Sequence, residues 1–261
     1  MKFNRLATAI AAAAITCTAS FTASASHSWN NYHWARTTSS FNLQVIDSVS
    51  SSWEDELNRS LGEWSQSSKL DLTVTSYSNS STTRRNCSAV SGKIRVCNYT
   101  YGNTGWLGLA SINLDSQGHI SQGTAKMNDT YSSDFASQNE RWHVMCQEVG
   151  HLFGLDHTST DGSSQGTCMD YSQSSSSTAP NQHDYDELAT IYSHLDSYKS
   201  ASAISALTLP SADKAMAGNV PMGVRIRRGV FDEVWAAPDG KGGVWIHHVL
   251  LAPGFEHADA L

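Results

Sequence analysis

The segment 146–157 limits what this chain of 261 residues can fold into more than any other stretch. It begins as an expected helix, in which residues four positions apart lie on one face, so Gln147 and His151 can point to one place. Gly154 can end this helix in a left-handed backbone conformation. The chain then returns, and His157 can face His151. The segment therefore predicts a helix and a returning loop whose polar side chains meet.

The side chains that meet there have the chemistry of a metal centre. Imidazole nitrogens are common zinc ligands, and catalytic zinc sites use three protein ligands and keep one position open. Gln147, His151 and His157 could supply three ligands. Glu148 lies one position after Gln147, where a carboxylate could act as the general base that activates water. The segment therefore predicts a catalytic zinc site with an unusual first ligand.

The same segment resembles the signature of the metzincin clan of zinc metallopeptidases. That signature is H-E-x-x-H-x-x-G-x-x-H, followed downstream by a turn that contains a methionine, the Met-turn. Residues 147–157 read Q-E-V-G-H-L-F-G-L-D-H and match every fixed position except the first. Residues 168–171, C-M-D-Y, are similar to the Met-turn. The resemblance covers roughly residues 40–197.

The resemblance implies a fold and an activity. The fold would be an α/β (α+β) catalytic domain with a twisted, mostly parallel sheet, an antiparallel edge strand, an active-site helix, the Met-turn and a C-terminal helix. The activity would be that of a zinc-dependent endopeptidase, in which Gln147, His151 and His157 hold Zn²⁺. Glu148 would be the general base. The substrate would be a protein or peptide bound in extended form along an edge strand.

Two residues of the Met-turn also receive roles from the resemblance. Met169 would form a hydrophobic floor under the metal. Tyr171 would be a further ligand or would stabilise the transition state, as a tyrosine at this position does in part of the clan. The alternative for Tyr171 is an aromatic side chain that packs beneath the site.

Gln147 departs from the signature, and three explanations compete. Its amide oxygen could bind zinc as a neutral donor that replaces a neutral imidazole, although less tightly. His143 could replace it, but about 12 Å along the helix axis separates His143 from His151, so we expect His143 to be a surface or first-turn histidine. The protein could instead be a catalytically inactive module that binds or inhibits peptides. The retention of Glu148, His151 and His157 favours an active enzyme.

Apolar periodicity predicts a layered domain with five strands and three helices. The strands are expected at 41–47, 70–75, 93–99, 106–114 and 119–127, and the helices near 53–64, 141–152 and 184–195. The strand at 119–127 precedes the site helix and has Gly123 at its middle. We expect it to be an exposed edge with which a peptide could pair, or else an ordinary edge strand.

Composition divides the chain into four parts. They are residues 1–25, a signal peptide; residues 26–40, an N-terminal arm; residues 41–197, the catalytic domain; and residues 198–261, a C-terminal appendage. The first part combines Lys2 and Arg5, an apolar run and an A-x-A site that ends at Ala25, which is typical of secretory signals. The protein is therefore predicted to be secreted, into the extracellular space or the periplasm.

The appendage is too short for an independent core, and we expect it to be strand-rich or partly disordered. Its expected strands are 224–226, 230–235 and 244–251. His247 and His248 would point to opposite faces of the last strand. These two histidines, and also His183 and His194, lack a partner at the spacing of a metal site. Surface or packing roles are therefore expected for all four.

Four cysteines follow the signal peptide, which allows three pairings in an oxidising compartment. We favour Cys87 with Cys97, across a short loop, and Cys146 with Cys168, which would join the site helix to a later turn. A zinc site formed by thiolates is a weaker alternative, because secreted thiols rarely stay reduced.

Charge and hydropathy exclude two classes of partner. The formal net charge is −7 and no basic stripe is present, which argues against nucleic acid. No stretch after residue 25 is apolar enough to cross a membrane. We expect a monomer, and the resemblance to the metzincin clan implies that it acts on proteins or peptides.

Overall fold

The computed structural model describes residues 26–135, 137–201 and 222–258, and these form a sheet with helices packed on it. The strands are β1 (Phe41–Ser48), β2 (Leu70–Tyr77), β3 (Lys93–Tyr99), β4 (Trp106–Leu114), β5 (Ile120–Asn128), β6 (Val224–Arg228), β7 (Asp232–Pro238) and β8 (Val244–Leu251). The helices are α1 (Glu54–Trp64), α2 (Ser81–Asn86), the 3₁₀ helix η1 (Asp129–Tyr131), α3 (Gln138–His151) and α4 (Gln182–Ile191). Apart from α2 and η1, these elements lie close to the expected ranges.

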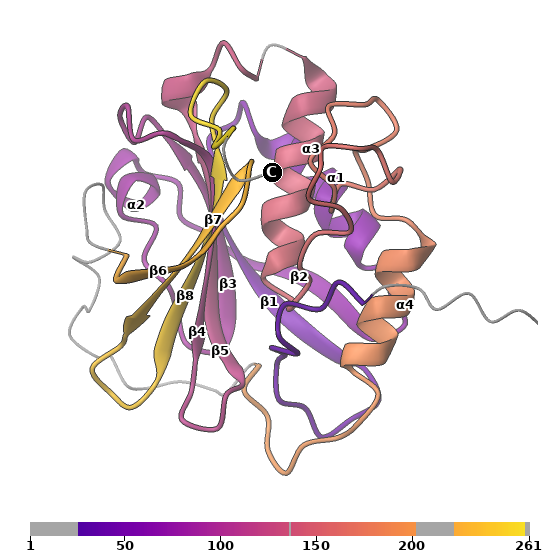
Figure 1. The fold of residues 1–261 in the computed structure, drawn as a ribbon. Helices are drawn as coiled ribbons and strands as arrows, with labels where there is room; N and C mark the ends of the chain where they lie inside the picture. Colours follow the sequence, from indigo (N-terminus) through magenta and orange to yellow (C-terminus); the bar gives the residue numbers. More distant parts are fainter. Residues whose placement is uncertain (1–25, 136, 202–221, 259–261) are drawn as a thin grey trace, which may run out of the picture.

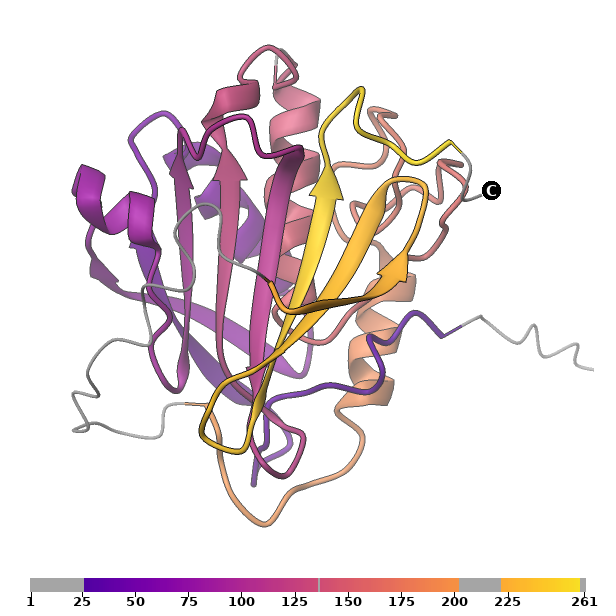
Figure 2. The same ribbon diagram turned by 60° about the vertical axis from the view of Figure 1, so that its left-hand side comes forward.

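All of the described strands belong to one sheet, in the order β2-β1-β3-β5-β4-β8-β7-β6. The half formed by β2, β1, β3 and β5 is parallel. From β5 onward every pairing is antiparallel. Figures 1 and 2 show how β8, β7 and β6 continue the sheet beyond β4. The general α/β class is therefore confirmed, but the sheet is not mostly parallel as predicted.

The prediction of an exposed edge at residues 119–127 is wrong. β5 lies inside the sheet between β3 and β4, and the other side of β4 is paired with β8. β4, which is antiparallel to both of its neighbours, is therefore not the predicted antiparallel edge strand either. The cause is the C-terminal segment, whose apolar residues Ile246 and Leu250 are buried in the core shared with the rest of the chain. This burial orders a segment that is too short to form its own core.

Helices α1 and α3 pack together on one face of the sheet (Figure 2). The apolar residues of α1 recur at helical spacing, and Trp53, Leu57, Leu61 and Trp64 are all buried, as expected. The indole Nε1 of Trp64 donates a hydrogen bond to the carbonyl oxygen of Cys146, at 3.0 Å. This bond connects α1 directly to the segment of α3 that carries the candidate site residues.

The N-terminal arm holds the loop that follows α3. Trp34 is fully buried, and its Nε1 donates a hydrogen bond to the carbonyl oxygen of Leu152, at 2.9 Å. The backbone N–H of Trp29 donates to the carbonyl oxygen of Gly154, at 2.7 Å. Gly154 has a φ of 94°, and a Cβ added there would lie 1.8 Å from the carbonyl oxygen of Tyr32. Only glycine fits this turn.

Both favoured disulfides are present. Cys87 bonds to Cys97 and Cys146 bonds to Cys168. The second bond joins α3 to the turn that contains Met169, so the two halves of the candidate site are covalently linked.

The sequence also led to predictions about export and about membrane spans. The predicted signal peptide, residues 1–25, lies outside the described residues. In the part of the chain that the structure describes, no helix is both long and apolar enough to cross a bilayer.

A substitution at Gly154 tests the turn after α3. We expect Gly154→Ala to lower the free energy of unfolding by about 3 kcal/mol or more, because it adds a clash with Tyr32 to the cost of a positive φ. Gly118→Ala is the control, since Gly118 has a φ of 86° with nothing within 4 Å of an added Cβ, and it should cost about 1 to 2 kcal/mol. Urea unfolding measures both. Equal losses would show that the contact with the N-terminal arm contributes nothing.

Candidate metal centre

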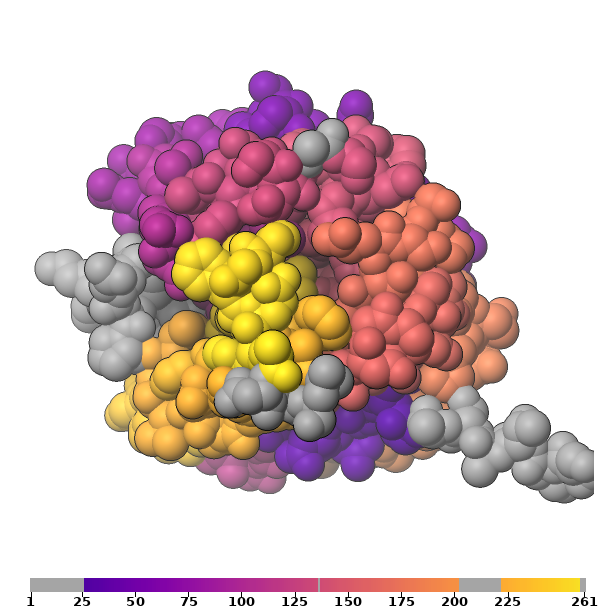
Figure 3. All heavy atoms as spheres, turned by 45° about the horizontal axis from the view of Figure 1, so that its top comes forward, coloured from indigo at the N-terminus to yellow at the C-terminus, as the bar shows by residue number. Residues whose placement is uncertain are grey.

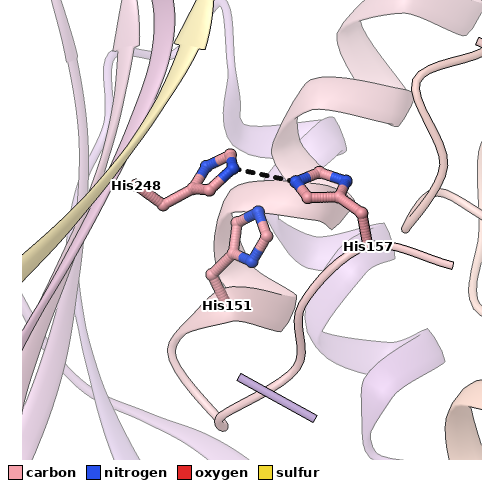
Figure 4. Close-up of side chains that lie close together, drawn as sticks. All are labelled: His151, His157 and His248. Atoms are coloured by element: carbon pink, nitrogen blue, oxygen red, sulfur yellow. Dashed lines mark hydrogen bonds between the residues drawn. The ribbon is translucent and has the colours of Figure 1, made fainter. Parts of the chain in front are cut away.

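Three buried histidines converge from three parts of the chain. His151 comes from the end of α3, His157 from the loop after it, and His248 from β8 (Figure 4). One ring nitrogen from each lies within 4.8 Å of those from the other two. A cluster of this kind could hold a metal ion.

His151 is oriented by the turn that follows its helix. Its Nδ1 donates a hydrogen bond to the carbonyl oxygen of Leu155, at 2.8 Å. This bond leaves Nε2 with a free lone pair, and Nε2 is buried without a hydrogen-bond partner. Burial lowers the pKa of His151 well below its usual value, and the nearby His248 lowers it further. His151 is therefore neutral and held as a metal ligand would be.

His157 and His248 face each other through Nε2 atoms that are 2.9 Å apart, the dashed line in Figure 4. Two ligand nitrogens on a tetrahedral zinc ion lie about 3.3 Å apart when each bond is about 2.0 to 2.1 Å. Burial lowers the pKa of His157 well below its usual value, with His248 and His151 adding to the effect. The spacing and the neutral state of His157 both suit metal coordination.

A tyrosine and an ion pair border the three histidines. The Tyr171 ring stacks on the ring of His157, with 3.9 Å between centroids, and its hydroxyl is 3.4 Å from His248 Nε2. Asp232 Oδ2 is 3.2 Å from the same nitrogen. Arg227 contacts Asp232 at 2.6 Å, and this ion pair helps to hold the pKa of Asp232 well below its usual range. The structure thus places Tyr171 beside the cluster.

Glu148 lies beside the histidines against the backbone of β4. Its carboxylate would be 2.3 Å from a Cβ added at Gly108, so a side chain at this position would displace the carboxylate. Ala110, two residues further along β4, is paired with His248 of β8, so Glu148 and His248 approach the same stretch of strand. Burial raises the pKa of Glu148 well above its usual value, and the backbone of Ala110 opposes this only in part. Neither carboxylate oxygen has a hydrogen bond of ordinary geometry.

The amide of Gln147 is oriented by the turn around Met169. Its Nε2 donates to the carbonyl oxygens of Cys168, at 3.1 Å, and Asp170, at 2.7 Å. A reversed amide would set its oxygen against two carbonyl oxygens, so these acceptors determine the orientation. Oε1 is consequently buried with no hydrogen-bond partner. Gln147 therefore offers a free neutral oxygen on the helix face that it shares with His151.

Met169 packs beneath α3. A Cβ added at Gly150 would lie 2.6 Å from its Sδ, so the methionine fills the space that this glycine leaves. The carbonyl oxygen of Met169 accepts a hydrogen bond from the backbone N–H of Thr158, at 2.8 Å. The turn thus supports both the helix and the loop that carries His157.

Two expectations about histidines are wrong. His143 is buried, not a surface residue: its Nδ1 lies 2.6 Å from the carbonyl oxygen of Ser177 and its Nε2 lies 3.3 Å from Gln147 Nε2. His248 was expected to have a surface or packing role, yet it belongs to the cluster. The only sequence signal was the alternation of side chains along a strand, which places His247 and His248 on opposite faces. His247 lies on the other face and contacts Ser111, at 2.8 Å.

The other histidines that were expected to lack partners also have them. His183 joins His27 and Asp184, and His194 joins His33 and Asp196, in two further groups with metal-ligand spacing. In the first, His27 Nε2 already contacts Asp184 Oδ1 at 3.1 Å. The second is partly exposed and includes three His–Asp contacts to Asp196. The cluster of His151, His157 and His248 differs from both because all three of its members are buried and are histidines; His248 also contacts Asp232 outside the cluster.

A pocket of about 270 Å³ adjoins the cluster. It extends from Tyr171 to Glu140 and His143 of α3 and is bounded by Leu250 and Glu256 of the C-terminal segment. The histidines themselves have almost no exposed surface, so this pocket ends beside the cluster.

Comparison with known proteins finds no family model that matches the chain and no curated protein that is similar to it in sequence.

The pocket contains a carboxylate that should make stability depend on pH. Burial, reinforced by Asp134, raises the pKa of Glu140 to about 7. The folded protein therefore binds this proton more tightly than the unfolded chain, and the free energy of unfolding should fall as pH rises from about 4.5 to about 7. Glu140→Gln should remove this decrease in the free energy of unfolding. The variant should therefore be more stable than wild type at pH 8 and about equally stable near pH 4.5.

Urea unfolding of wild type and Glu140→Gln at several pH values measures the difference. Asp134→Asn serves as the second variant, because the loss of its charge should lower the pKa of Glu140 and shrink the effect. A stability difference between Glu140→Gln and wild type that stays the same across this pH range would contradict the prediction.

Proposed function

We propose that this protein is a secreted zinc-dependent endopeptidase. The observation that carries the proposal is the convergence of His151, His157 and His248 in a buried site, next to the carboxylate of Glu148. Buried polar atoms are normally hydrogen-bonded, and His151 Nε2 is not. A metal ion would satisfy it.

The donor set fits zinc. Imidazole nitrogens and a neutral amide oxygen are ligands that zinc accepts, and Gln147 Oε1 lacks any other partner. We assign zinc binding to His151 and His157, with Gln147 as the third ligand and with His248 as a further nitrogen at the same point. Bound zinc would acidify a water molecule and polarise the carbonyl group of the substrate.

Glu148 is the proposed general base. Its carboxylate is held against Gly108 of β4, in a site from which solvent is excluded, and it has no competing hydrogen bond. It would accept the proton of the attacking water and deliver it to the departing amine. Tyr171, whose hydroxyl lies at the cluster, would donate a hydrogen bond to the oxygen on which charge develops.

The substrate would be an extended protein or peptide. Glu148 lies against β4, and a peptide that took the place of β8 beside this strand would present its backbone carbonyl groups to the histidines. The two disulfides suit a protein that works in an oxidising compartment.

Metal content tests the site directly. The purified protein should bind about one zinc ion per chain, and His151→Ala should reduce the occupancy at least tenfold, because it removes the most clearly oriented ligand. His183→Ala is the control, since His183 lies in a different histidine group. Elemental analysis after dialysis measures both. Equal zinc in wild type and His151→Ala would place the metal elsewhere.

Glu148→Gln tests the chemistry. The variant should retain zinc and lose peptide hydrolysis by a factor of about 100 or more, because the base is removed while the volume is kept. Fluorogenic peptides and labelled casein measure the rate. Hydrolysis that survives the substitution would exclude the proposed mechanism. Zinc binding without any hydrolysis, in the wild type and also in variants that uncover the site, would favour the non-catalytic peptide-binding or inhibitory module.

A further inference from the structure

We propose that the C-terminal segment 222–258 is an intramolecular inhibitor of this site. In this inference β8 occupies the side of β4 with which a substrate would pair, and His248 occupies the position at the metal that an attacking water needs. The inference rests on the proposed function, and it adds how the same site is regulated.

The first argument is the pairing of β4. β8 runs antiparallel to β4 along the whole strand, from the pair Trp106 and Leu251 to the pair Leu114 and Val244. The opposite side of β4 is paired with β5. A peptide that binds by strand addition needs unpaired backbone groups at an edge. β4 has no such edge while β8 is in place.

The second argument is the position of His248. It is fully buried and lies 2.9 Å from His157, whereas its neighbour His247 points to the opposite face. With Gln147 as a ligand, His248 would make a fourth protein ligand. Sites with four protein ligands are closed, as in structural zinc sites, while catalytic sites keep one position open. Withdrawal of His248 would open that position.

The third argument is an ion pair that fastens the segment to the loop of the site. Arg227 of β6 contacts both carboxylate oxygens of Asp156, at 2.5 and 3.0 Å, and Asp156 precedes His157. Arg227 also contacts Asp232, which contacts His248. Charge-assisted bidentate bonds of this kind are among the stronger polar contacts. The segment is thus held at the point where it meets the metal ligands.

The fourth argument is that the segment covers the site. Phe231 packs against the ring of Tyr171, with 5.3 Å between centroids, and Val234 and Leu250 are buried in the core. Figure 3 shows this part of the chain, in orange and yellow, lying between the magenta and salmon parts of the same face. His151 and Glu148 have no exposed surface, so an external peptide cannot reach them in this conformation.

Inhibition of this kind depends on how rarely the segment withdraws. The rate of hydrolysis is proportional to the open fraction, so a variant that weakens the closed form raises the rate by the same factor. Loss of one hydrogen bond between charged groups typically changes an equilibrium about tenfold or more. We therefore expect increases of about tenfold in full-length variants that loosen the segment.

His248→Ala removes the contact with the site, and His247→Ala is its matched control on the opposite face of β8. We expect His248→Ala to keep about one zinc per chain and to hydrolyse fluorogenic peptides about tenfold faster than wild type or His247→Ala. The combined change with Glu148→Gln should abolish the gain.

Arg227→Gln loosens the segment without removing any metal ligand. Arg225→Gln is its matched control, because Arg225 lies on the same strand with similar exposure and pairs with Glu233 inside the segment. We expect Arg227→Gln, but not Arg225→Gln, to speed hydrogen exchange of the β8 amides and to raise hydrolysis about tenfold. Exchange is measured by mass spectrometry on the zinc-loaded proteins.

The outcomes separate the two proposals. A gain in either His248→Ala or Arg227→Gln over its matched control, with zinc retained, supports the inhibitor. If the zinc-loaded wild type hydrolyses peptides and neither variant is faster, the inhibitor is excluded and the proposed function stands. Loss of zinc from His248→Ala, without a gain in Arg227→Gln, also excludes it, since His248 would then be a permanent ligand. Zinc-loaded variants that all lack hydrolysis overturn the proposed function itself.

Discussion

The antiparallel pairing of β4 with β8 is the interaction on which the candidate site depends. It brings His248 to His151 and His157, at the stretch of β4 against which Glu148 of α3 lies. Removal of these groups from water lowers the pKa values of His151 and His157 and raises that of Glu148. The pairing therefore assembles the ligands, keeps His151 and His157 neutral and closes the site in one step. The proposed metal ligand and the proposed barrier to substrate therefore come from the same strand.

The polar atoms at this place are unusual for a protein interior. His151 Nε2, Gln147 Oε1 and both carboxylate oxygens of Glu148 are buried without hydrogen-bond partners. Each such atom typically costs about 1 to 3 kcal/mol, and a chain that keeps several of them together must gain something from them. A bound metal ion would offset this cost for the nitrogen and the amide oxygen, because both are neutral donors. The rigid surroundings, which include the Cys146–Cys168 bond and the close packing of Met169 on Gly150, keep these atoms from relaxing toward other partners.

Local patterns predicted the parts of the site that depend on local geometry. The helix that carries Gln147 and His151, the positive φ of Gly154 and the approach of His157 follow from residues less than a dozen positions apart. The strands of the C-terminal segment were also predicted close to their observed ranges, because alternation is a local signal. Their partner was not predicted. His248 and His157 are 91 positions apart, and no spacing rule connects a histidine in a β-strand to one in a distant loop.

The sequence by itself determined which residues could act: two histidines and a glutamine near a glutamate, a turn that only glycine permits, and cysteines placed to join helix and turn. The tertiary structure decided which of them meet and whether a substrate could reach them. Strand order is set by burial of apolar side chains such as Ile246 and Leu250 in a shared core, and this depends on the whole chain. The same burial placed an expected edge strand inside the sheet, and it made His248, for which a surface or packing role was expected, a member of the candidate metal site.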